Sequence, residues 1–581
     1  MTAPLIQASP APPPSASAVG TRLRAHRWGL LLAAGWLGQT VLRIWFSIGQ
    51  AVPMANPDET AYLITARVLA GGPATNLSGG TLYPAGYSLL ISPVFWFTHN
   101  PVTAYHAVLV VNALFSALLM PLAYIAGRRL GLDRPAAYAV ATVTALLPAG
   151  FFYSEYALTD AIYPVVVLAW LLATHSWLTA STRRSRWAVA VGSALLAGYA
   201  DAVHSRGLVI VVCYLAFSGY VFLRRLVPRD TVVAVALALA ATAFVSWAVN
   251  LHLAKALYPN GARSLSGQAK QRIASVHGAV AVLEMAAGQL WRFTLDGWGV
   301  AAIGLVAAAV VVVRRSKVTA DLRLMAVLAI AVTAIIAITA PAALPSDQPQ
   351  AWASGRYLDG MITTFFVVGV ALLLRADRRQ VLGCAAVVAP ATALTAVAVV
   401  AYAGASVPTN GFSAAFNFAE PAVLTQNWMR ANVALATAVE LGLLAVWVTA
   451  VLTLPARARS AVLAGLAVVS IAATAQMTIT ISRASTPIQQ ASLISGPTPN
   501  DQIAISRSLN WEVWVPQAYE VWWTHLALFS PRWEQPASGV TVVEVPWAGK
   551  TAQASWPQAP PGWRVARSSA AGGWVVWRYA P

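Results

Sequence analysis

The sequence predicts an α-helical polytopic membrane protein, and three observations lead to that fold class. Of its 581 residues, 58% are hydrophobic and 10% are charged, whereas charged residues make up about a quarter of an ordinary soluble domain. The apolar residues gather in runs of about 20, the length at which a helix crosses a bilayer. Short groups of arginine and lysine stand between alternate runs. This composition excludes an ordinary soluble protein.

The apolar runs predict about 13 transmembrane helices. They lie near residues 28–48, 102–126, 136–154, 159–179, 187–203, 207–223, 231–250, 294–313, 322–341, 357–374, 381–403, 432–454 and 461–481. The first run is too long for the apolar core of a cleaved signal peptide, so we expect it to remain as a membrane helix. We assign residues 25–483 to this transmembrane domain. Residues 1–24 start with a segment rich in Pro, Ala and Ser and are expected to form a disordered cytoplasmic tail.

Basic clusters predict the orientation in the membrane. They occur in every second connection: Arg128 and Arg129; Arg183, Arg184 and Arg186; Arg224, Arg225 and Arg229; Arg314, Arg315 and Lys317; Arg375, Arg378 and Arg379; Arg457 and Arg459. Because cytoplasmic loops are enriched in Lys and Arg, the N-terminus is expected inside and the C-terminal region outside. The same distribution accounts for the net charge of +18 without a nucleic-acid partner.

The segments on the predicted outer face are longer and more polar. Residues 82–96 form an aromatic stretch too short to cross easily, and residues 268–289 lie within the long loop 251–293; both are expected to form helices in the membrane interface. Such helices would shape a slot between lipid and water, which a lipid substrate needs. Residues 484–581 are rich in Pro and Trp and contain strand-like segments. They predict a small α/β or mostly β domain outside the membrane.

The tryptophans of this C-terminal segment allow two interpretations. They can stack on sugar rings, or they can form a membrane-interface belt or a protein core. The residues concerned include Trp522, Trp523, Trp547, Trp563, Trp574 and Trp577.

Two adjacent carboxylates stand where the chain leaves the first membrane helix. Asp58 and Glu59 fall in the first turn of an expected amphipathic helix, where carboxylates offset the helix dipole. Asn56 and Pro57 suit the cap and the first position of that helix, so capping alone also explains the pattern. Asp58 shares a helix face with Tyr62. A carboxylate outside the membrane beside a hydrophobic slot is what a transferase needs as a general base.

Further charged residues belong to the candidate site. Asp160 stands at the start of the fourth predicted span, close to Glu155 at the end of the third, and an acid at that depth is costly unless it is paired. A phosphate leaving group would need cations that stabilise its developing charge. The candidates on the outer face are Arg206, Lys270, Arg272 and Arg356, although salt bridges or anchoring at the headgroup level explain such cations equally well.

Other polar residues in or near the apolar runs have simpler explanations. Arg43 is expected to be an interfacial or paired arginine, Glu440 to pair within the bundle, and His204 to be structural. Cys213 and Cys384 lie inside apolar runs and form no metal-ligand pattern. Zinc-type spacings, phosphate-binding glycine loops and serine elbows are not convincing anywhere in the sequence. We therefore assign no cofactor, and a divalent metal is possible but not indicated.

Together these motifs resemble the C-type membrane glycosyltransferase superfamily, in particular the protein O-mannosyltransferases and the lipid aminoarabinose transferases. The resemblance covers about residues 25–480. It rests on Arg43 in the first span; Pro57, Asp58, Glu59 and Tyr62; Tyr83, Pro84 and Gly86; the segment from Glu155 to Asp160; Ser205, Arg206 and Gly207; and the pair Arg356 and Tyr357. The aminoarabinose transferases carry a lysine shortly before the proline of the loop helix, whereas residues 80–83 here contain no cation.

The resemblance implies an inverting transfer of a single sugar, mannose or arabinose in type, from a polyprenyl-phosphate donor. The acceptor would be a glycan, lipid or protein of the cell envelope. Asp58 would be the base, although Glu59 stays open because both carboxylates start the same helix. Asp160 would be a second acidic site residue. Arg356 and Tyr357 would contact the donor phosphate, and Tyr62 and Tyr83 are further candidates for substrate binding.

The usage of arginine and alanine over lysine suggests a GC-rich bacterium, so the plasma membrane of a bacterium is the expected location, with the active site facing outside. A polytopic transporter or flippase of lipid-linked envelope precursors is the alternative function. Such a protein would be expected to show an internal repeat and paired broken helices, and neither is clear in this sequence.

Overall fold

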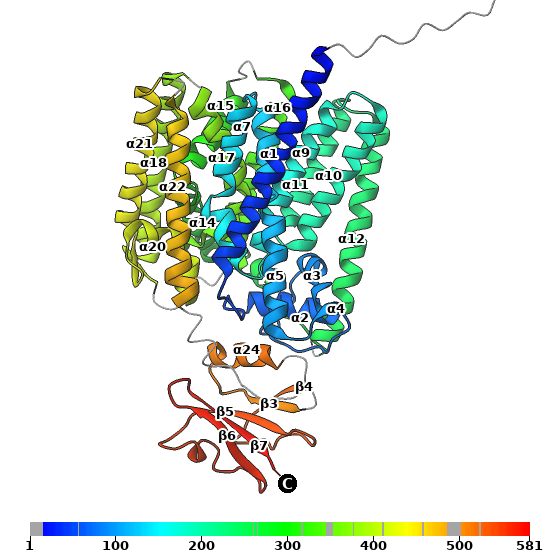
Figure 1. Cartoon of the computed structure of the whole chain (residues 1–581), viewed down its shortest axis with the longest axis vertical. Coiled ribbons are helices and arrows are strands. Elements are labelled where there is room, and N and C mark those ends of the chain that lie inside the picture. The colour runs from blue at the N-terminus through cyan, green and yellow to red at the C-terminus, as the bar shows by residue number, and fades with distance from the viewer. Residues whose placement is uncertain are drawn as a thin grey trace, which may run out of the picture.

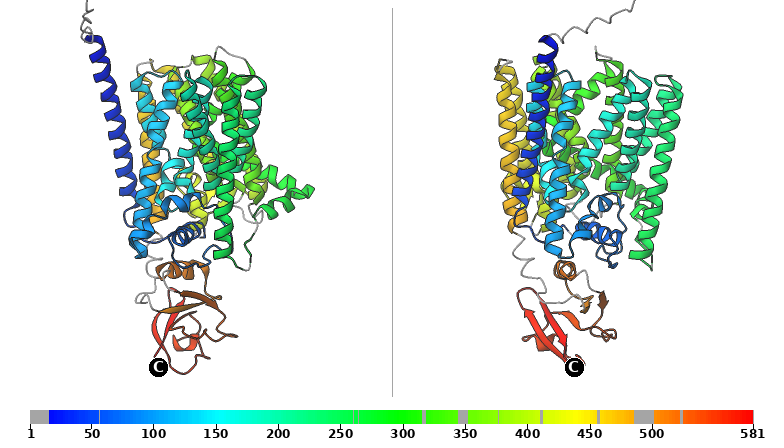
Figure 2. Two further views of the ribbon diagram at one scale, coloured as in Figure 1. Left: turned by 90° about the vertical axis from the view of Figure 1, so that its right-hand side faces the viewer. Right: turned by 45° about the vertical axis from the view of Figure 1, so that its right-hand side comes forward.

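The computed structural model describes residues 16–55, 57–259, 261–263, 265–314, 318–343, 352–375, 377–409, 412–455, 458–484, 501–521 and 525–580. Long helices form a bundle, and the C-terminal residues form a small sheet domain at one end of it (Figure 1). The short helices α2, α3 and α4 lie at that same end, as two further views show (Figure 2). The end of the bundle beside the sheet domain is therefore the one that carries irregular structure.

The first half of the chain is almost entirely helical. Its elements are α1 Ala16–Ser47, α2 Asp58–Leu69, α3 Gly86–Ile91, α4 Val94–Phe97, α5 Pro101–Ser116, α6 Leu119–Arg129, α7 Arg134–Ala145, α8 Pro148–Phe151, η1 Phe152–Glu155, η2 Thr159–Ala161, α9 Tyr163–Thr179, α10 Arg183–Val203, α11 Gly207–Leu223, α12 Arg229–Leu257, α13 Leu265–Ile273 and α14 Val276–Asp296. Here η1 and η2 are short 3₁₀ helices, which break the long elements next to the sheet-domain end.

The second half completes the bundle and then changes to strands. Its elements are α15 Val300–Val313, α16 Ala320–Thr339, η3 Ala340–Ala343, η5 Gly355–Leu358, α17 Asp359–Arg375, α18 Arg378–Ala403, β1 Ser406–Pro408, α19 Phe412–Asn417, α20 Ala419–Thr425, β2 Arg430–Asn432, α21 Val433–Thr453, α22 Ser460–Met477, η7 Thr478–Arg483, β3 Gln502–Ser506, α24 Trp511–Glu520, β4 His525–Phe529, β5 Val542–Pro546, η8 Gln553–Ser555, β6 Trp563–Ser569 and β7 Trp574–Tyr579.

Eight helices in the described part of the chain are long and apolar enough to cross a membrane, and two bent pairs raise that number to ten. The bent pairs are Arg134–Ala145 with Pro148–Glu155, at 71°, and Val276–Asp296 with Val300–Val313, at 112°. The polytopic helical fold is thus confirmed. The predicted count of 13 spans and the predicted orientation stay predictions. For the count, α9 and α11 have 17 residues each and fall short of a full crossing on length alone.

The region after α12 differs from the prediction of a loop with one interfacial helix over residues 268–289. Two helices, α13 and α14, occupy it, and α14 continues to Asp296. Met285 and Gln289 are fully buried, so this part of α14 packs in the bundle rather than lying in the interface. Gly299 then adopts a φ of +69°, a backbone conformation that favours glycine, and the chain turns into α15. The predicted span 294–313 is therefore split at this turn.

The N-terminal helix also has different limits from those predicted. Helix α1 starts at Ala16, inside the range 1–24 that the sequence assigns to a tail, while residues 1–15 lie outside the described residues. Arg43 of α1 is buried, and its guanidinium donates to the side chain of Gln39 at 2.6 Å, to Ser116 at 3.1 Å and to the carbonyl of Ala145 at 2.7 Å. Arg43 therefore ties α1 to its neighbours instead of anchoring at the interface.

The C-terminal residues form the small sheet domain that the sequence predicts. The strand order is β4-β3-β5-β7-β6. β3 pairs in parallel with β4 and β5, while β5, β7 and β6 are antiparallel. Helix α24 provides the crossover that a parallel pair requires. Trp574 and Trp577 are buried in this domain, which favours the core interpretation for these two tryptophans. Trp522 and Trp523 lie outside the described residues.

Helix α24 joins the sheet domain to the bundle. Tyr519 is fully buried, its hydroxyl donates to the carbonyl of Pro101 at 2.9 Å, and its ring meets Tyr105 edge to face at 6.4 Å. Both partners belong to α5, so the sheet domain sits directly against the start of a membrane helix.

Candidate active site

Four charged side chains form a continuous cluster at the sheet-domain end of the bundle. Arg356 donates to Asp58 at 2.6 Å, and Arg206 donates to Asp160 at 2.9 Å. Arg356 also lies 4.0 Å from the second carboxylate oxygen of Asp160, so it connects the two pairs. The structure thus brings together residues predicted as the base, the second acid and two of the cations.

Asp58 is the most exposed member of this cluster. Its side chain is 23% exposed, compared with 5% for Asp160 and 4% for Arg206. One oxygen of Asp58 accepts from the hydroxyl of Tyr83 at 2.7 Å and the other accepts from Arg356. The carboxylate is therefore held from two sides but still reaches a surface where a second molecule can approach it.

Arg206 lies behind this surface and holds the other members in place. It donates to the backbone carbonyl of Arg356 at 2.8 Å, and its backbone N–H and Nε donate to Nδ1 of His204 at 3.1 and 3.2 Å. A ring nitrogen that accepts hydrogen bonds carries no proton. Burial and the nearby Arg206 accordingly keep the pKa of His204 well below its usual range. His204 thus acts as a neutral structural acceptor, as the sequence predicts.

The electrostatics of the buried pair formed by Asp160 and Arg206 favour its charged form. Burial raises the pKa of Asp160, but the positive charges of Arg206 and Arg356 outweigh burial and hold that pKa below its ordinary value. The guanidinium of Arg206 also lies 4.8 Å from the ring centre of Tyr163 and 5.2 Å from that of Tyr357, distances at which a cation is attracted to an aromatic face. Hydrogen bonds and aromatic faces therefore stabilise the pair on several sides.

Glu59 has a different role from its neighbour Asp58. It is fully buried, and its carboxylate accepts from the N–H groups of Met54 and Ala55, both at 2.6 Å, from the N–H of Ala157 at 2.7 Å and from the hydroxyl of Tyr105 at 2.7 Å. Burial raises the pKa of Glu59, while these four donors oppose that shift. Glu59 thus ties the start of α2 to the turn that leads to Asp160.

Replacing Glu59 with glutamine is expected to lower the free energy of unfolding by about 1–3 kcal/mol. Each oxygen of Glu59 accepts from at least one backbone N–H, so either orientation of an amide would point its NH₂ group at a donor. The measurement is SDS-induced unfolding in mixed micelles, followed by tryptophan fluorescence. An unchanged unfolding curve would contradict the structural role assigned to Glu59.

The two tyrosines predicted for substrate binding lie beside the cluster. The ring of Tyr62 is buried and meets the rings of Tyr83 and Tyr87 edge to face, both at 5.3 Å. Tyr83 stands just before helix α3, which confirms a short helix in the predicted aromatic stretch. A cavity of about 330 Å³ lies between α3, α10 and α12 and is lined almost entirely by apolar side chains. It begins at Ala85, two residues after Tyr83.

Lys270 and Arg272 are not brought to this cluster. Both lie on α13, where Lys270 is exposed, and Arg272 donates to the carbonyl of Pro341 in η3 at 3.3 Å. Helix α13 packs against η3 and α14 rather than against α2. Lys270 and Arg272 were predicted from sidedness alone, which does not specify where on the outer face a loop helix lies.

A second charged cluster, which the sequence did not predict, supports the turn that carries Arg356. Arg292 donates to Asp296 at 2.9 Å, to Glu420 and to the carbonyl of Asn417 at 3.0 Å, and all three charged groups are fully buried. A side chain added at Gly355 would lie 2.2 Å from an oxygen of Asp296. Glycine at position 355 therefore lets the backbone of η5 rest directly on this cluster. The i, i+4 spacing of Arg292 and Asp296 was the available sequence signal.

Glu155 and Glu440 are two further buried acids. Glu155 accepts from Gln50 at 3.1 Å, Thr478 at 2.6 Å and Ser482 at 3.3 Å, so it links η1 to η7 and to the segment that follows α1. Glu440 was predicted to pair within the bundle. Among the described residues, neither of its oxygens has a hydrogen-bond partner, so that prediction is wrong there. Within the same residues, no group of three or more His, Cys, Asp or Glu side chains is placed to hold a metal ion.

Comparisons with known proteins identify the architecture. No protein-family model matches the sequence, and no curated protein matches it. A crystal structure of ArnT from Cupriavidus metallidurans bound to undecaprenyl phosphate matches with a TM-score of 0.53 and 16% identity, over 95% of this chain and 98% of that chain. The chain has the fold of ArnT. The apo state of ArnT matches over the same shares with a TM-score of 0.51 and 16% identity.

The predicted resemblance to C-type membrane glycosyltransferases is thus confirmed at the level of the fold, since ArnT is a lipid aminoarabinose transferase of that class. An oligosaccharyltransferase from Archaeoglobus fulgidus matches 88% of this chain and 69% of that chain with 11% identity and a TM-score of 0.42.

Residues 80–83, which lack the lysine of the aminoarabinose transferases, lie beside the loop that follows α12. The backbone N–H of Arg263 donates to the carbonyl of Gly80 at 2.7 Å, and Arg263 is paired with Thr81. Arg263 is exposed. The loop after α12 therefore brings an arginine next to a turn that contains no cation of its own.

Proposed function

We propose that this protein is a membrane glycosyltransferase that moves one sugar, mannose or arabinose in type, from a polyprenyl-phosphate donor to an envelope acceptor outside the cytoplasm. The observation that carries the proposal is the position of Asp58. It is a partly exposed carboxylate fixed by Tyr83 and Arg356, and it opens onto the end of a bundle whose fold is shared with a protein that binds undecaprenyl phosphate.

In the proposed reaction, Asp58 accepts the proton of the acceptor hydroxyl. The hydroxyl oxygen forms a bond to the anomeric carbon of the sugar while the bond from that carbon to the phosphate oxygen breaks. The electron pair leaves with the polyprenyl phosphate, and the configuration at the anomeric carbon inverts. The two hydrogen bonds on Asp58 hold its carboxylate in one orientation, which reduces the entropy cost of aligning it with the acceptor.

Arg356 is the cation best placed to meet the donor phosphate. Its side chain is 15% exposed and lies beside Asp58, while Arg206 is 4% exposed and committed to Asp160. A fixed guanidinium stabilises the negative charge that develops on the leaving phosphate. We therefore assign phosphate contact to Arg356, together with its neighbour Tyr357, and a positioning role to Arg206.

The apolar cavity between α3, α10 and α12 supports a lipid-linked donor. It is lined by Gly86 and Leu89 of α3, Tyr199 of α10 and Val245 of α12, among other residues. An apolar cavity whose lining begins two residues after Tyr83 suits a prenyl chain whose phosphate lies at the charged cluster. In this arrangement the chain stays in an apolar environment while the sugar faces the acceptor.

The test is transfer of radiolabelled sugar by the purified full-length protein in liposomes. Polyprenyl-phosphate mannose and polyprenyl-phosphate arabinose serve as donors, and extracted envelope glycans, lipids and proteins serve as acceptors. We expect label to appear on an acceptor and free polyprenyl phosphate to accumulate with one of the donors. Movement of intact lipid-linked precursor between the leaflets, without release of polyprenyl phosphate, would contradict the proposal and favour the transporter alternative.

A further inference from the structure

A second cavity, of about 490 Å³, lies at the end of the bundle opposite the charged cluster. Helix α9 starts at Tyr163, close to Asp160, and His175 at the cavity lies near its other end. At a rise of 1.5 Å per residue, that stretch of helix measures about 18 Å. Helix α17 likewise runs from Asp359 to Arg375, which also borders the cavity. This space is therefore separate from the proposed active site.

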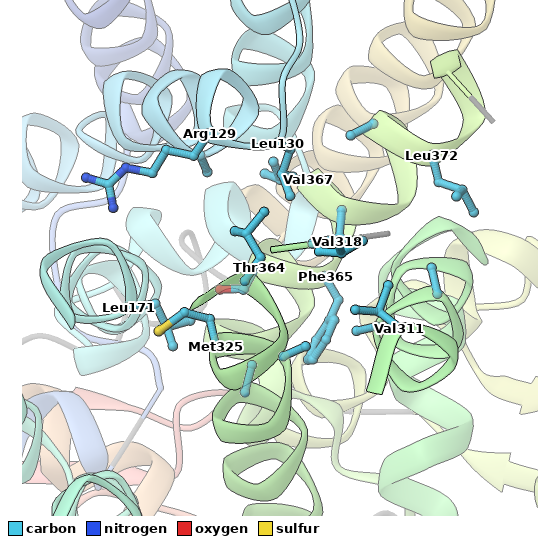
Figure 3. A pocket seen from close by; sticks show the side chains of 18 of the residues that line it. Arg129, Leu130, Leu171, Val311, Val318, Met325, Thr364, Phe365, Val367 and Leu372 are labelled. Atoms are coloured by element: carbon cyan, nitrogen blue, oxygen red, sulfur yellow. The ribbon is translucent and has the colours of Figure 1, made fainter. Parts of the chain in front are cut away.

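The interior of the cavity is apolar. Leu171 of α9, Val311 of α15, Met325 of α16, and Phe365 and Val367 of α17 surround it (Figure 3). The nearby helix positions are occupied by small residues, including Ala308 and Ala329, which leave the space open. The volume falls in the range of about 300–1,000 Å³ that is usual for sites of small organic ligands.

Two arginines stand at the border of this apolar space. In Figure 3 the guanidinium of Arg129 lies to one side of the apolar side chains. It donates to the carbonyl of Leu172 at 2.5 Å and to the hydroxyl of Ser176 at 2.6 Å, and it lies 3.1 Å from Nδ1 of His175. Arg375 donates to the carbonyl of Leu130 at 2.8 Å. Among the described residues these partners are neutral oxygen atoms and an imidazole nitrogen.

The acids nearby do not neutralise the two arginines. Asp321 is bonded to Nε2 of His175 at 2.7 Å, and in the described part of the chain no carboxylate lies within ion-pair distance of Arg129 or Arg375. Gly131 has a φ of +83°, and a side chain there would lie 2.4 Å from Arg375. The turn after α6 thus lets Arg375 approach the end of the helix that carries Arg129, and both arginines line the cavity.

We propose that this cavity binds an anionic phospholipid of the surrounding membrane, with an acyl chain in the apolar space and the phosphate between Arg129 and Arg375. An apolar cavity bordered by two cations that have no direct ion pair among the described residues matches a ligand that has an apolar chain and an anionic head. Capping of their own helices is a weaker explanation, because both arginines reach across to other elements. The lipid would connect α6, α9, α15, α16 and α17 at the end of the bundle where the described loops are most basic.

Lipid binding to the delipidated full-length protein in detergent tests this proposal by native mass spectrometry. The probes are phosphatidylglycerol and phosphatidylcholine with the same acyl chains, so that they differ in headgroup charge. We expect one phosphatidylglycerol to bind at least 10-fold more tightly than phosphatidylcholine. The double variant Arg129→Gln/Arg375→Gln should lose that preference. The matched control is Arg128→Gln, since Arg128 is exposed, bonds to a carbonyl in the same way and does not line the cavity.

Filling the cavity provides a second, independent variant. Ala329→Trp places a large side chain in the apolar space and is expected to abolish the tight binding of phosphatidylglycerol. Equal affinity for the two lipids, or the same preference in the arginine variant, would overturn the proposal whether or not Ala329→Trp folds. Displacement of phosphatidylglycerol by a lower concentration of undecaprenyl phosphate would also overturn it, because the occupant would then be a prenyl lipid.

Discussion

Replacing Asp58 with asparagine is expected to lower the rate of sugar transfer by about 10²–10⁴-fold, the usual contribution of a general base. Asparagine has nearly the same shape, and its carbonyl oxygen can still accept a hydrogen bond from Tyr83 or Arg356. It cannot take up the proton of the acceptor hydroxyl. The measurement is the initial rate of label transfer in liposomes, with the donor that supports transfer by the wild-type protein.

Two variants serve as controls for the Asp58 result. Asp201→Asn makes the same chemical change at another carboxylate of the predicted outer face, at the end of α10, and should leave the rate close to wild type. Glu59→Gln should lower stability but reduce transfer much less than Asp58→Asn. A rate for Asp58→Asn equal to that of the wild type would remove Asp58 from the mechanism. Loss of transfer in a stably folded Glu59→Gln variant alone would make Glu59 the base.

Replacing Arg206 with glutamine is expected to lower the free energy of unfolding by about 3–5 kcal/mol, as is usual when one partner of a buried ion pair is removed. Asp160 is 5% exposed and would lose the partner that lies 2.9 Å away. Arg356 could not replace it, because Arg356 is 4.0 Å from Asp160 and already bonded to Asp58. SDS-induced unfolding in mixed micelles would measure the change.

Two further variants distinguish the effect of breaking the buried Arg206–Asp160 pair from a general effect of removing an arginine. The double variant Arg206→Gln/Asp160→Asn removes both charges and should recover part of the stability. Arg183→Gln breaks an ion pair with Asp230 in which the arginine is 81% exposed, and little change is expected because solvent screens such pairs. An Arg206→Gln variant as stable as Arg183→Gln would contradict the importance assigned to the buried pair.

The stabilisation by Arg206 should also depend on pH in a specific direction. Because the pKa of Asp160 is lower in the folded protein than its ordinary value, the ionised pair stabilises the fold above the unfolded pKa of about 4. Without Arg206, burial of Asp160 is opposed by less positive charge, so the pKa of Asp160 should be higher in the Arg206→Gln variant than in the wild type. The difference in stability between the two proteins should therefore be largest at high pH. It should shrink as the pH falls through the range between the two pKa values, where Asp160 is protonated in the variant and ionised in the wild type.

The main features of the fold could be predicted because they depend on local composition. Apolar runs of about 20 residues lead to long helices whatever their neighbours are, and the strand-like segments near Val543 and Val575 form a sheet as expected. The interfacial helix expected over residues 268–289 was wrong in part. The amphipathic face of α14 packs in the bundle, and the periodicity of a helix does not reveal whether its apolar face meets lipid or protein.

The identities of the site residues followed from the sequence, but their connections did not. Asp58, Asp160, Arg206 and Arg356 were all expected on one face, because charge in an apolar chain is rare and therefore informative. Lys270 and Arg272 satisfied the same rule and lie elsewhere, on α13. Charge and predicted sidedness locate a residue along the membrane normal only. They therefore cannot distinguish residues that contact Asp58 from residues that lie at the same depth elsewhere in the membrane plane.

The sequence by itself thus determined the class of fold and a short set of charged residues. It also distinguished the short basic connections from the longer, more polar segments. Each of these features is encoded in a continuous stretch of chain. Only the tertiary structure decided that Arg356 pairs with Asp58, 298 positions away in the chain, that Glu59 supports the backbone, and that Arg292 with Asp296 and Glu420 holds the turn at Gly355. These contacts depend on how the helices pack. Packing joins segments that are distant along the chain, and the pattern within any one segment does not specify it.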